Sequence, residues 1–166
     1  MIYLKLLAAF AVCLCGALIG RSKTVYEKER AALTADLSAC LADMADEIST
    51  IQTPIPQLMR RISACERPAA PFFGAVLKNM ETMPLGEAWK SALPSVDLPT
   101  AEHEIMSALA AGFGKYDANS QASELNLAAS RLEKQVNIIR EKISREGKLS
   151  TALGASLGAM CAIMLL

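Results

Sequence analysis

The residue types that most often carry chemistry are few in this chain, and their spacing does not bring them together. The one histidine, His103, lies between Glu102 and Glu104. A metal site or a nucleophile–base pair needs partners at a defined spacing, and none is spaced to serve His103. We therefore expect a solvated histidine in the first turn of a helix, with no catalytic or metal-binding role.

The five cysteines follow no metal-ligand pattern either. Cys13, Cys15 and Cys161 lie in apolar terminal segments, while Cys40 and Cys65 lie on the apolar faces of expected helices. The chain has an odd number of cysteines, and Cys40 and Cys65 lie in a domain that we expect to face the cytosol; this predicts reduced, buried thiols rather than a disulfide framework.

Phosphate-binding and nucleic-acid-binding signals are also missing. The segment Gly112-Phe113-Gly114 lacks a third glycine and follows a helical pattern, so it predicts a turn rather than a nucleotide cradle. The 17 basic residues are balanced by 17 acidic ones, so there is no global basic field to attract nucleic acid. We expect no catalytic residue, no cofactor, no metal and no nucleic-acid partner.

The 166 residues, 52% of them hydrophobic, fall into three segments. Residues 21–148 hold 16 of the 17 basic and all 17 acidic residues, which leaves both ends almost uncharged. A helix of 18 residues, the length of the C-terminal segment, covers about 27 Å, close to the hydrocarbon thickness of a bilayer. We predict transmembrane helices at residues 1–20 and 149–166 and a cytoplasmic domain at residues 21–148.

The N-terminal segment fits an uncleaved span better than a signal peptide. A signal peptide needs a stronger positive start and small residues at its cleavage site, but only Lys5 precedes the apolar run, and Leu18 and Ile19 interrupt its small residues. Basic residues crowd the inner end of each predicted span: Arg21, Lys23, Lys28, Arg30, Arg140, Lys142, Arg145 and Lys148. Because positive residues stay on the cytoplasmic side, we expect an integral membrane protein with a cytoplasmic domain and both termini outside.

Small residues recur at four-residue spacing in both predicted spans: Gly16, Gly20, Ser150, Gly154 and Gly158. This spacing permits close helix packing, either between the two spans or between subunits. Small residues are also common in membrane helices without such a role, so both interpretations stay open.

The middle domain has a helical pattern throughout, without strand-like alternation. We predict an all-α, compact six-helix antiparallel bundle between the two transmembrane helices. The first cytoplasmic helix should bury a face that ends at Ile51, and the second, capped by Thr53, should bury Cys65. Two short helices follow around residues 71–80 and 86–93, then a helix capped by Thr100 and, after a turn, a long last helix reaching Gly147.

Four sequence strings, in this order and spacing, resemble the stage III sporulation protein AB family over essentially the whole chain. They are Glu47-Ile48-Ser49 with Thr53-Pro54-Ile55-Pro56, then Glu87-Ala88-Trp89, then Phe113-Gly114-Lys115-Tyr116-Asp117 with Gln121, and finally Gly147-Lys148-Leu149 with Leu153-Gly154. The chain departs from the family pattern at Phe113 and Tyr116, where the family usually has Leu and Ser.

This resemblance implies a subunit of the channel apparatus between mother cell and forespore, on the mother-cell side of the membrane surrounding the forespore. The family's cytoplasmic domain is similar to the helical domain of the platform protein of type II secretion systems. The resemblance thus implies a non-enzymatic scaffold that docks a secretion-type ATPase (stage III sporulation protein AA-like) and other channel-apparatus subunits. Packing of the spans between subunits would in addition give a homo-oligomer. The alternative is a small membrane-anchored signalling or transport component whose helical domain binds a ligand in a polar pocket.

Four residues are candidates for partner docking: Gly114, Asp117, Gln121 and Trp89. The first three match the family at a loop, where functional residues are common. A purely structural role is the alternative, in which Gly114 allows a positive φ and Asp117 and Gln121 cap the last helix. Trp89 is either an interface anchor or, as is commoner on a short amphipathic helix, a core residue.

Overall fold

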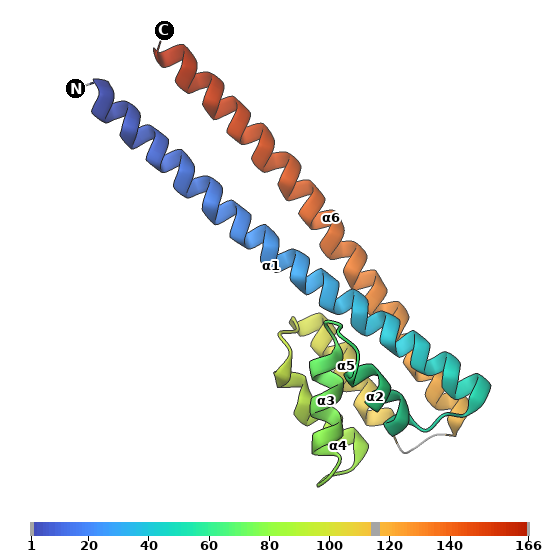
Figure 1. Ribbon diagram of the computed structural model, residues 1–166. Coiled ribbons are helices and arrows are strands. Elements are labelled where there is room, and N and C mark those ends of the chain that lie inside the picture. Colours follow the sequence, from blue (N-terminus) through green and yellow to red (C-terminus); the bar gives the residue numbers. More distant parts are fainter. Residues whose placement is uncertain (1, 114–116, 166) are drawn as a thin grey trace. The chain divides into compact units, whose positions relative to one another are not determined.

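The computed structural model describes the backbone of residues 2–113 and 117–165 and the side chains of residues 25–113, 117 and 119–145. Over these residues the chain forms six α-helices and one short 3-10 helix, with no strand (Figure 1). The elements are α1 (Ile2–Ile51), α2 (Ile55–Ser63), α3 (Ala70–Asn79), α4 (Leu85–Ala92), η1 (Leu93–Ser95), α5 (Thr100–Gly112) and α6 (Ala118–Leu165). The predicted all-α class and the order of the six helices are confirmed.

The chain divides into two compact units. Unit 1 comprises Met1–Glu29 and Ile139–Leu166, and unit 2 comprises Arg30–Ile138. Within unit 1 the Lys142 ammonium lies 3.3 Å from the Glu27 carboxylate and so connects α6 to α1. The predicted transmembrane segments at residues 1–20 and 149–166 belong to this unit but lie outside the residues whose side chains are described. Among the described residues, no helix combines the length and the apolar character needed to cross a bilayer.

Prolines begin three of the shorter helices. Pro54, Pro84 and Pro99 precede α2, α4 and α5 with φ of −62°, −61° and −63° and extended ψ. The predictions of Thr53 and Thr100 as caps are therefore wrong. The proline ring fixes its own φ and disfavours helical geometry in the residue before it. The proline therefore takes the cap position, and Thr100 is the first residue of α5.

An aromatic cluster fills the core of unit 2 between α3, α4 and α5. Phe72, Phe73 and Trp89 are fully buried and meet edge to face, with ring centroids 4.9–5.9 Å apart. Phe113 contacts Trp89 at 5.0 Å. The indole Nε1–H of Trp89 donates to the carbonyl oxygen of Met106 at 3.0 Å, which satisfies its one polar atom and fixes α4 against α5.

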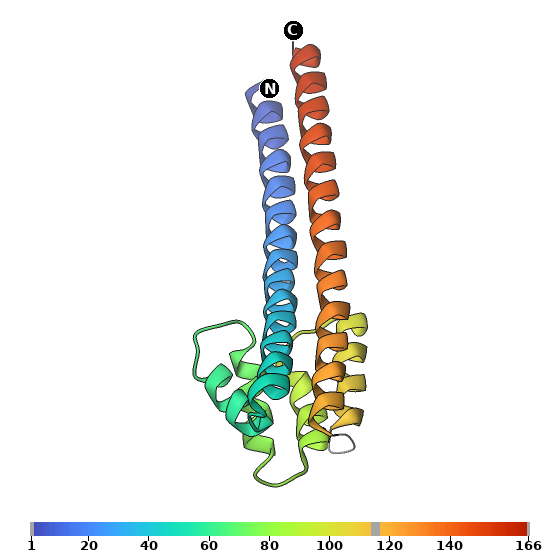
Figure 2. The ribbon, with the colours of Figure 1, turned by 90° about the vertical axis from the view of Figure 1, so that its right-hand side faces the viewer.

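An alanine-rich seam joins α1 to α6 within unit 2, where the two helices run antiparallel, side by side (Figures 1 and 2). The hydroxyl of Ser38 crosses this seam and donates to the carbonyl oxygen of Ala129 at 2.8 Å. Buried alanines line both helices: Ala31, Ala45, Ala122, Ala128 and Ala129. Small side chains allow the two backbones to approach closely enough for this bond.

Two predicted core positions are wrong. Ile51 is 71% exposed because it is the last residue of α1 and the chain turns away at Gln52. Cys65 is exposed because α2 ends at Ser63, which breaks the helical spacing that would have carried Cys65 inward. Cys40 is buried as predicted, and its burial raises the pKa of the thiol to about 12.

Candidate docking surface

The end of α1 and the beginning of α6 lie at the same end of unit 2 (Figures 1 and 2). We call residues 50–52 and 117–121 the tip. Residues 50–52 end α1 and residues 117–121 begin α6, next to connecting segments, where functional residues are common in proteins.

The α1 side of the tip combines an exposed apolar side chain with an unusual backbone. Ile51 has the largest exposed fraction among the large hydrophobic residues described, 71%. Gln52 follows with φ of 57°, in the left-handed region that commonly terminates helices. The turn at Gln52 therefore ends the helix sharply and leaves Ile51 projecting from its last turn.

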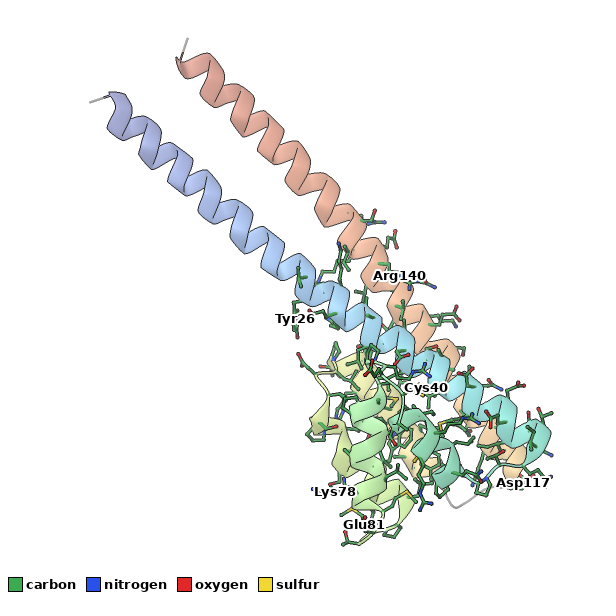
Figure 3. All side chains as sticks on the ribbon, in the orientation of Figure 1. Tyr26, Cys40, Lys78, Glu81, Asp117 and Arg140 are labelled. Atoms are coloured by element: carbon green, nitrogen blue, oxygen red, sulfur yellow. The ribbon has the colours of Figure 1, made fainter. Side chains whose placement is uncertain are left out.

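The α6 side of the tip is organised by Asp117, which is labelled in Figure 3. Its Oδ1 accepts a hydrogen bond from the backbone N–H of Ser120 at 3.3 Å, and its carbonyl oxygen accepts one from the backbone N–H of Gln121 at 2.9 Å. Asp117 is therefore the N-cap of α6. Hydrogen bonds from the Ser120 side chain and then its backbone lower the pKa of the Asp117 carboxyl, so its negative charge is held at the positive end of a helix dipole.

The structure separates the four predicted docking residues. Asp117 is exposed and caps α6, whereas Gln121 is half-buried in the same first turn. Trp89 has no exposed surface, which agrees with the core interpretation and leaves it no side-chain area for a partner. Gly114 lies outside the described residues. The predicted packing residues lie in parts of α1 and α6 for which only the backbone is described, so their packing is not tested: Gly16, Gly20, Ser150, Gly154 and Gly158.

Ion pairs hold α1 of unit 2 against the shorter helices. The guanidinium of Arg61 on α2 binds both carboxylate oxygens of Glu47, one turn before the tip. Arg30 donates to the buried carboxylate of Glu102 on α5 at 3.4 Å. Such pairs restrict how helices rotate against one another, so they fix the direction in which α1 presents its end.

The Asp36 carboxylate secures the connection between α2 and α3. It accepts hydrogen bonds from Nε and Nη2 of Arg67 at 2.9 and 2.6 Å and from the backbone N–H of Ala69 at 2.8 Å. The hydrogen bonds that Arg67 donates to Asp36 raise the pKa of the guanidinium, which therefore stays charged. These hydrogen bonds hold the segment between α2 and α3 against the middle of α1.

A surface hollow of about 140 Å³ lies between α1 and α2. It is lined by Asp43, Met44, Arg61, Ile62, Cys65 and Arg67. Ligand pockets usually measure about 300–1,000 Å³, and both arginines here already bind carboxylates. The hollow therefore lends no support to a ligand-binding component. Among the described residues, no group of three or more His, Cys, Asp or Glu side chains is placed to hold a metal ion.

Ile51 is the tip residue that the sequence pattern assigned wrongly. It continued the three-and-four spacing of the buried face, which predicted a core position. The signal against that position was the nearby Thr53-Pro54, because a helix usually ends before the residue that precedes a proline. A side chain in the last turn of a helix has no following turn to cover it, so it can remain exposed even when it continues the spacing of the buried face.

Comparison with solved structures finds a match to a protein described as Stage III sporulation protein AB, with a TM-score of 0.62 and 22% sequence identity. The match covers 70% of this chain and 97% of the other, and at that identity it shows a shared fold. No curated protein sequence matches significantly. The family model of Stage III sporulation protein AB matches residues 5–166, nearly the whole chain. The chain therefore belongs to the stage III sporulation protein AB family.

Proposed function

We propose that the chain is a non-enzymatic platform subunit of the sporulation channel between mother cell and forespore, and that it docks a cytoplasmic secretion-type ATPase to the membrane complex. One observation carries this proposal, namely the family match over residues 5–166. A match of that extent includes both apolar ends and the helical domain, so it applies to the arrangement as a whole rather than to a single motif.

The proposed location of the chain follows from the basic residues that flank its two apolar segments. The terminal segments anchor the chain in the membrane surrounding the forespore, the helical domain faces the mother-cell cytoplasm, and both termini lie outside. Support comes from the basic residues that flank both apolar segments, such as Arg21 and Lys148. Protease added after the mother-cell membrane is opened, with the forespore membranes left sealed, should digest residues 21–148, and protection of that segment would overturn the orientation.

The tip is the surface that we propose for the ATPase. It combines an exposed apolar side chain, Ile51 at the end of α1, with the polar start of α6 at Asp117. An exposed isoleucine alone is common on a monomer. Here the Glu47–Arg61 pair and the turn at Gln52 fix its position, so little conformational entropy is lost when a partner covers it.

The experiment is a pull-down of the full-length protein from sporulating cells in mild detergent. The wild-type chain should recover the ATPase, and Ile51→Asp should reduce recovery at least about tenfold because a charge would be desolvated at the contact. Lys78→Glu is the matched control, since Lys78 is an exposed residue at the α3 end, at a different place on unit 2 from Asp117 (Figure 3).

The two parts of the proposal fail in different ways. If the wild-type chain recovers no ATPase, the platform function is wrong. If wild type, Ile51→Asp and Lys78→Glu all recover it equally, the platform function stands and the docking surface lies elsewhere than the tip.

A further inference from the structure

The outward face of α6 in unit 2 carries two large apolar side chains that flank two basic ones. Leu127 and Ile138 are 44% and 57% exposed. Arg131 and Lys134 lie between them on the same face, also exposed, and neither forms an ion pair within the described part of the chain. We call these four residues the basic stripe. Their successive intervals are four, three and four residues, the spacing of one helix face.

The outward face of α1 in unit 2 has the opposite character. Ala39, Asp43, Asp46 and Thr50 are all exposed and lie opposite the buried face of that helix; we call them the acidic stripe. Their intervals are again four, three and four residues. The stripe combines small side chains with carboxylates.

The acidic charge of α1 is not cancelled by the neighbouring arginines. Asp43 lies beside Arg61 and Arg67 at the surface hollow. Each guanidinium is already bound to another carboxylate of α1, Arg61 to Glu47 and Arg67 to Asp36. Three carboxylates of α1, those of Asp36, Asp43 and Glu47, thus lie near two guanidiniums, which leaves an excess of negative charge on this side of unit 2.

The two stripes match each other when the helices run antiparallel. With the intervals aligned, Asp46 falls beside Arg131 and Asp43 beside Lys134. At the ends of the match the bulky Ile138 falls over the small Ala39, and Leu127 falls beside Thr50, next to the exposed Ile51. Opposite charges therefore meet in the middle and large side chains meet small ones outside, a pattern that favours close helix packing.

The stripes cannot meet within one chain. In unit 2, α1 and α6 already pack through their buried faces, where the Ser38 hydroxyl is bonded to Ala129, and the stripes occupy the opposite sides of both helices. The antiparallel match consequently requires two chains.

We propose that a second copy of this chain docks its acidic stripe on the basic stripe of the first. The contact is heterologous, since different faces of the two copies are joined, and each copy keeps one stripe free for a further neighbour. Because Ser38 is level with Ala129 within one chain, this register displaces each copy by about 15 Å along the helix axis, so successive copies extend as a staggered row. An acidic helix of another protein could offer similar charge, but the acidic stripe of this chain is a surface whose spacing matches residue by residue. The inference does not depend on ATPase docking at the tip, although the acidic stripe and the tip share Thr50.

The first test measures the mass of the full-length protein in mild detergent as a function of concentration. Wild type should form oligomers. The double variants Arg131→Glu/Lys134→Glu and Asp43→Lys/Asp46→Lys should each weaken association at least about tenfold, because like charges would face one another. A mixture of the two double variants should regain association, since each supplies the charge that the other needs.

The matched control is Lys78→Glu/Lys90→Glu, which reverses two exposed charges on α3 and α4 and should leave the oligomer unchanged. Circular dichroism and thermal unfolding check that each variant folds. A wild-type chain that stays monomeric at every concentration overturns the proposal. So does a mixture that fails to regain association, because the two stripes would then not be partners.

The second test fixes the register. Ala39→Cys and Ile138→Cys are placed in separate chains in which Cys13, Cys15, Cys65 and Cys161 are replaced by Ala, while the buried Cys40 is kept. A short thiol cross-linker should give dimers from the mixture and none from either variant alone. Dimers from Ile138→Cys alone would indicate a two-fold contact and overturn the heterologous one. If stripe reversal abolishes ATPase recovery but not self-association, the basic stripe belongs to that partner and the proposal is wrong.

Discussion

The aromatic cluster and the alanine seam achieve helix packing in opposite ways. In the cluster, Trp89, Phe72 and Phe73 fill the space between short helices with large rings. In the seam, alanines bring α1 and α6 together and a single hydroxyl, that of Ser38, reaches a backbone carbonyl across the interface. The packing of the cluster depends on the large area that its rings bury, whereas the packing of the seam depends on the close approach of two helix backbones.

This difference follows from helix length. A helix of 8–13 residues, such as α3, α4 or α5, has little independent stability, so each must bury large side chains to be held. The helices α1 and α6 have 50 and 48 residues and maintain many backbone hydrogen bonds of their own. The seam between them mainly fixes how the two helices are placed against each other and contributes less to the free energy of unfolding. Substitutions in the aromatic cluster should therefore lower the free energy of unfolding by more than substitutions in the seam.

The largest expected effect is at the centre of the cluster. Trp89→Ala should lower the free energy of unfolding by about 3–5 kcal/mol, because it removes a fully buried ring and leaves a cavity among Phe72, Phe73 and Phe113. Urea unfolding of the full chain in mild detergent measures the change. Trp89→Phe, which keeps a ring but loses the bond to Met106, should cost less. A loss below about 1 kcal/mol for Trp89→Ala would mean that the cluster does not hold the short helices.

The next effect tests how closely α4 approaches α5. A Cβ at Gly86 would lie 2.7 Å from the carbonyl oxygen of Ala110, a backbone atom that cannot rotate away. Gly86→Ala should therefore cost about 1–3 kcal/mol through overpacking. Gly74→Ala on α3 is the matched control.

At Gly74 the nearest atom, Cβ of Ser63, would be 3.9 Å from the added methyl group, an ordinary contact. That variant should be neutral or stabilising by up to about 1 kcal/mol, because alanine restricts the unfolded chain. Thermal unfolding of both variants in the same detergent provides the comparison. Equal effects at the two glycines would show that α4 and α5 are not held at this separation.

Hydrophobic periodicity predicted much of the fold because it depends on local sequence. The buried face of α1, with Leu37, Met44 and Ile48, follows directly from three-and-four spacing, and the prolines mark the starts of the shorter helices. The same rule failed at Ile51, where it continued past the end of the helix. Periodicity records which residues share a face and carries no information on where neighbouring helices stop.

The candidate surfaces were less predictable because they depend on which faces remain uncovered. Asp117 could be recognised as a cap from its place before a helical pattern, and the structure confirms that hydrogen bond. The stripes on α1 and α6 could not be recognised as surfaces from sequence, since charged residues such as Asp43 and Lys134 are expected on any solvated face. Their matching intervals gain meaning only when the fold shows that both faces are exposed and lie on opposite sides of the seam.

The smallest expected effect is in the seam itself. Ser38→Ala removes the hydroxyl that donates to the carbonyl oxygen of Ala129 at 2.8 Å but keeps a small side chain. Because the close approach of the helices is retained, the cost should be that of one hydrogen bond, about 1 kcal/mol. Ser49→Ala is the matched control, since Ser49 is exposed and its hydroxyl bonds to Asp46 of the same helix. That control should stay within about 0.5 kcal/mol of wild type in urea unfolding. If Ser38→Ala proves as costly as Trp89→Ala, the seam supplies stability as well as position, and the contrast between the two regions does not hold.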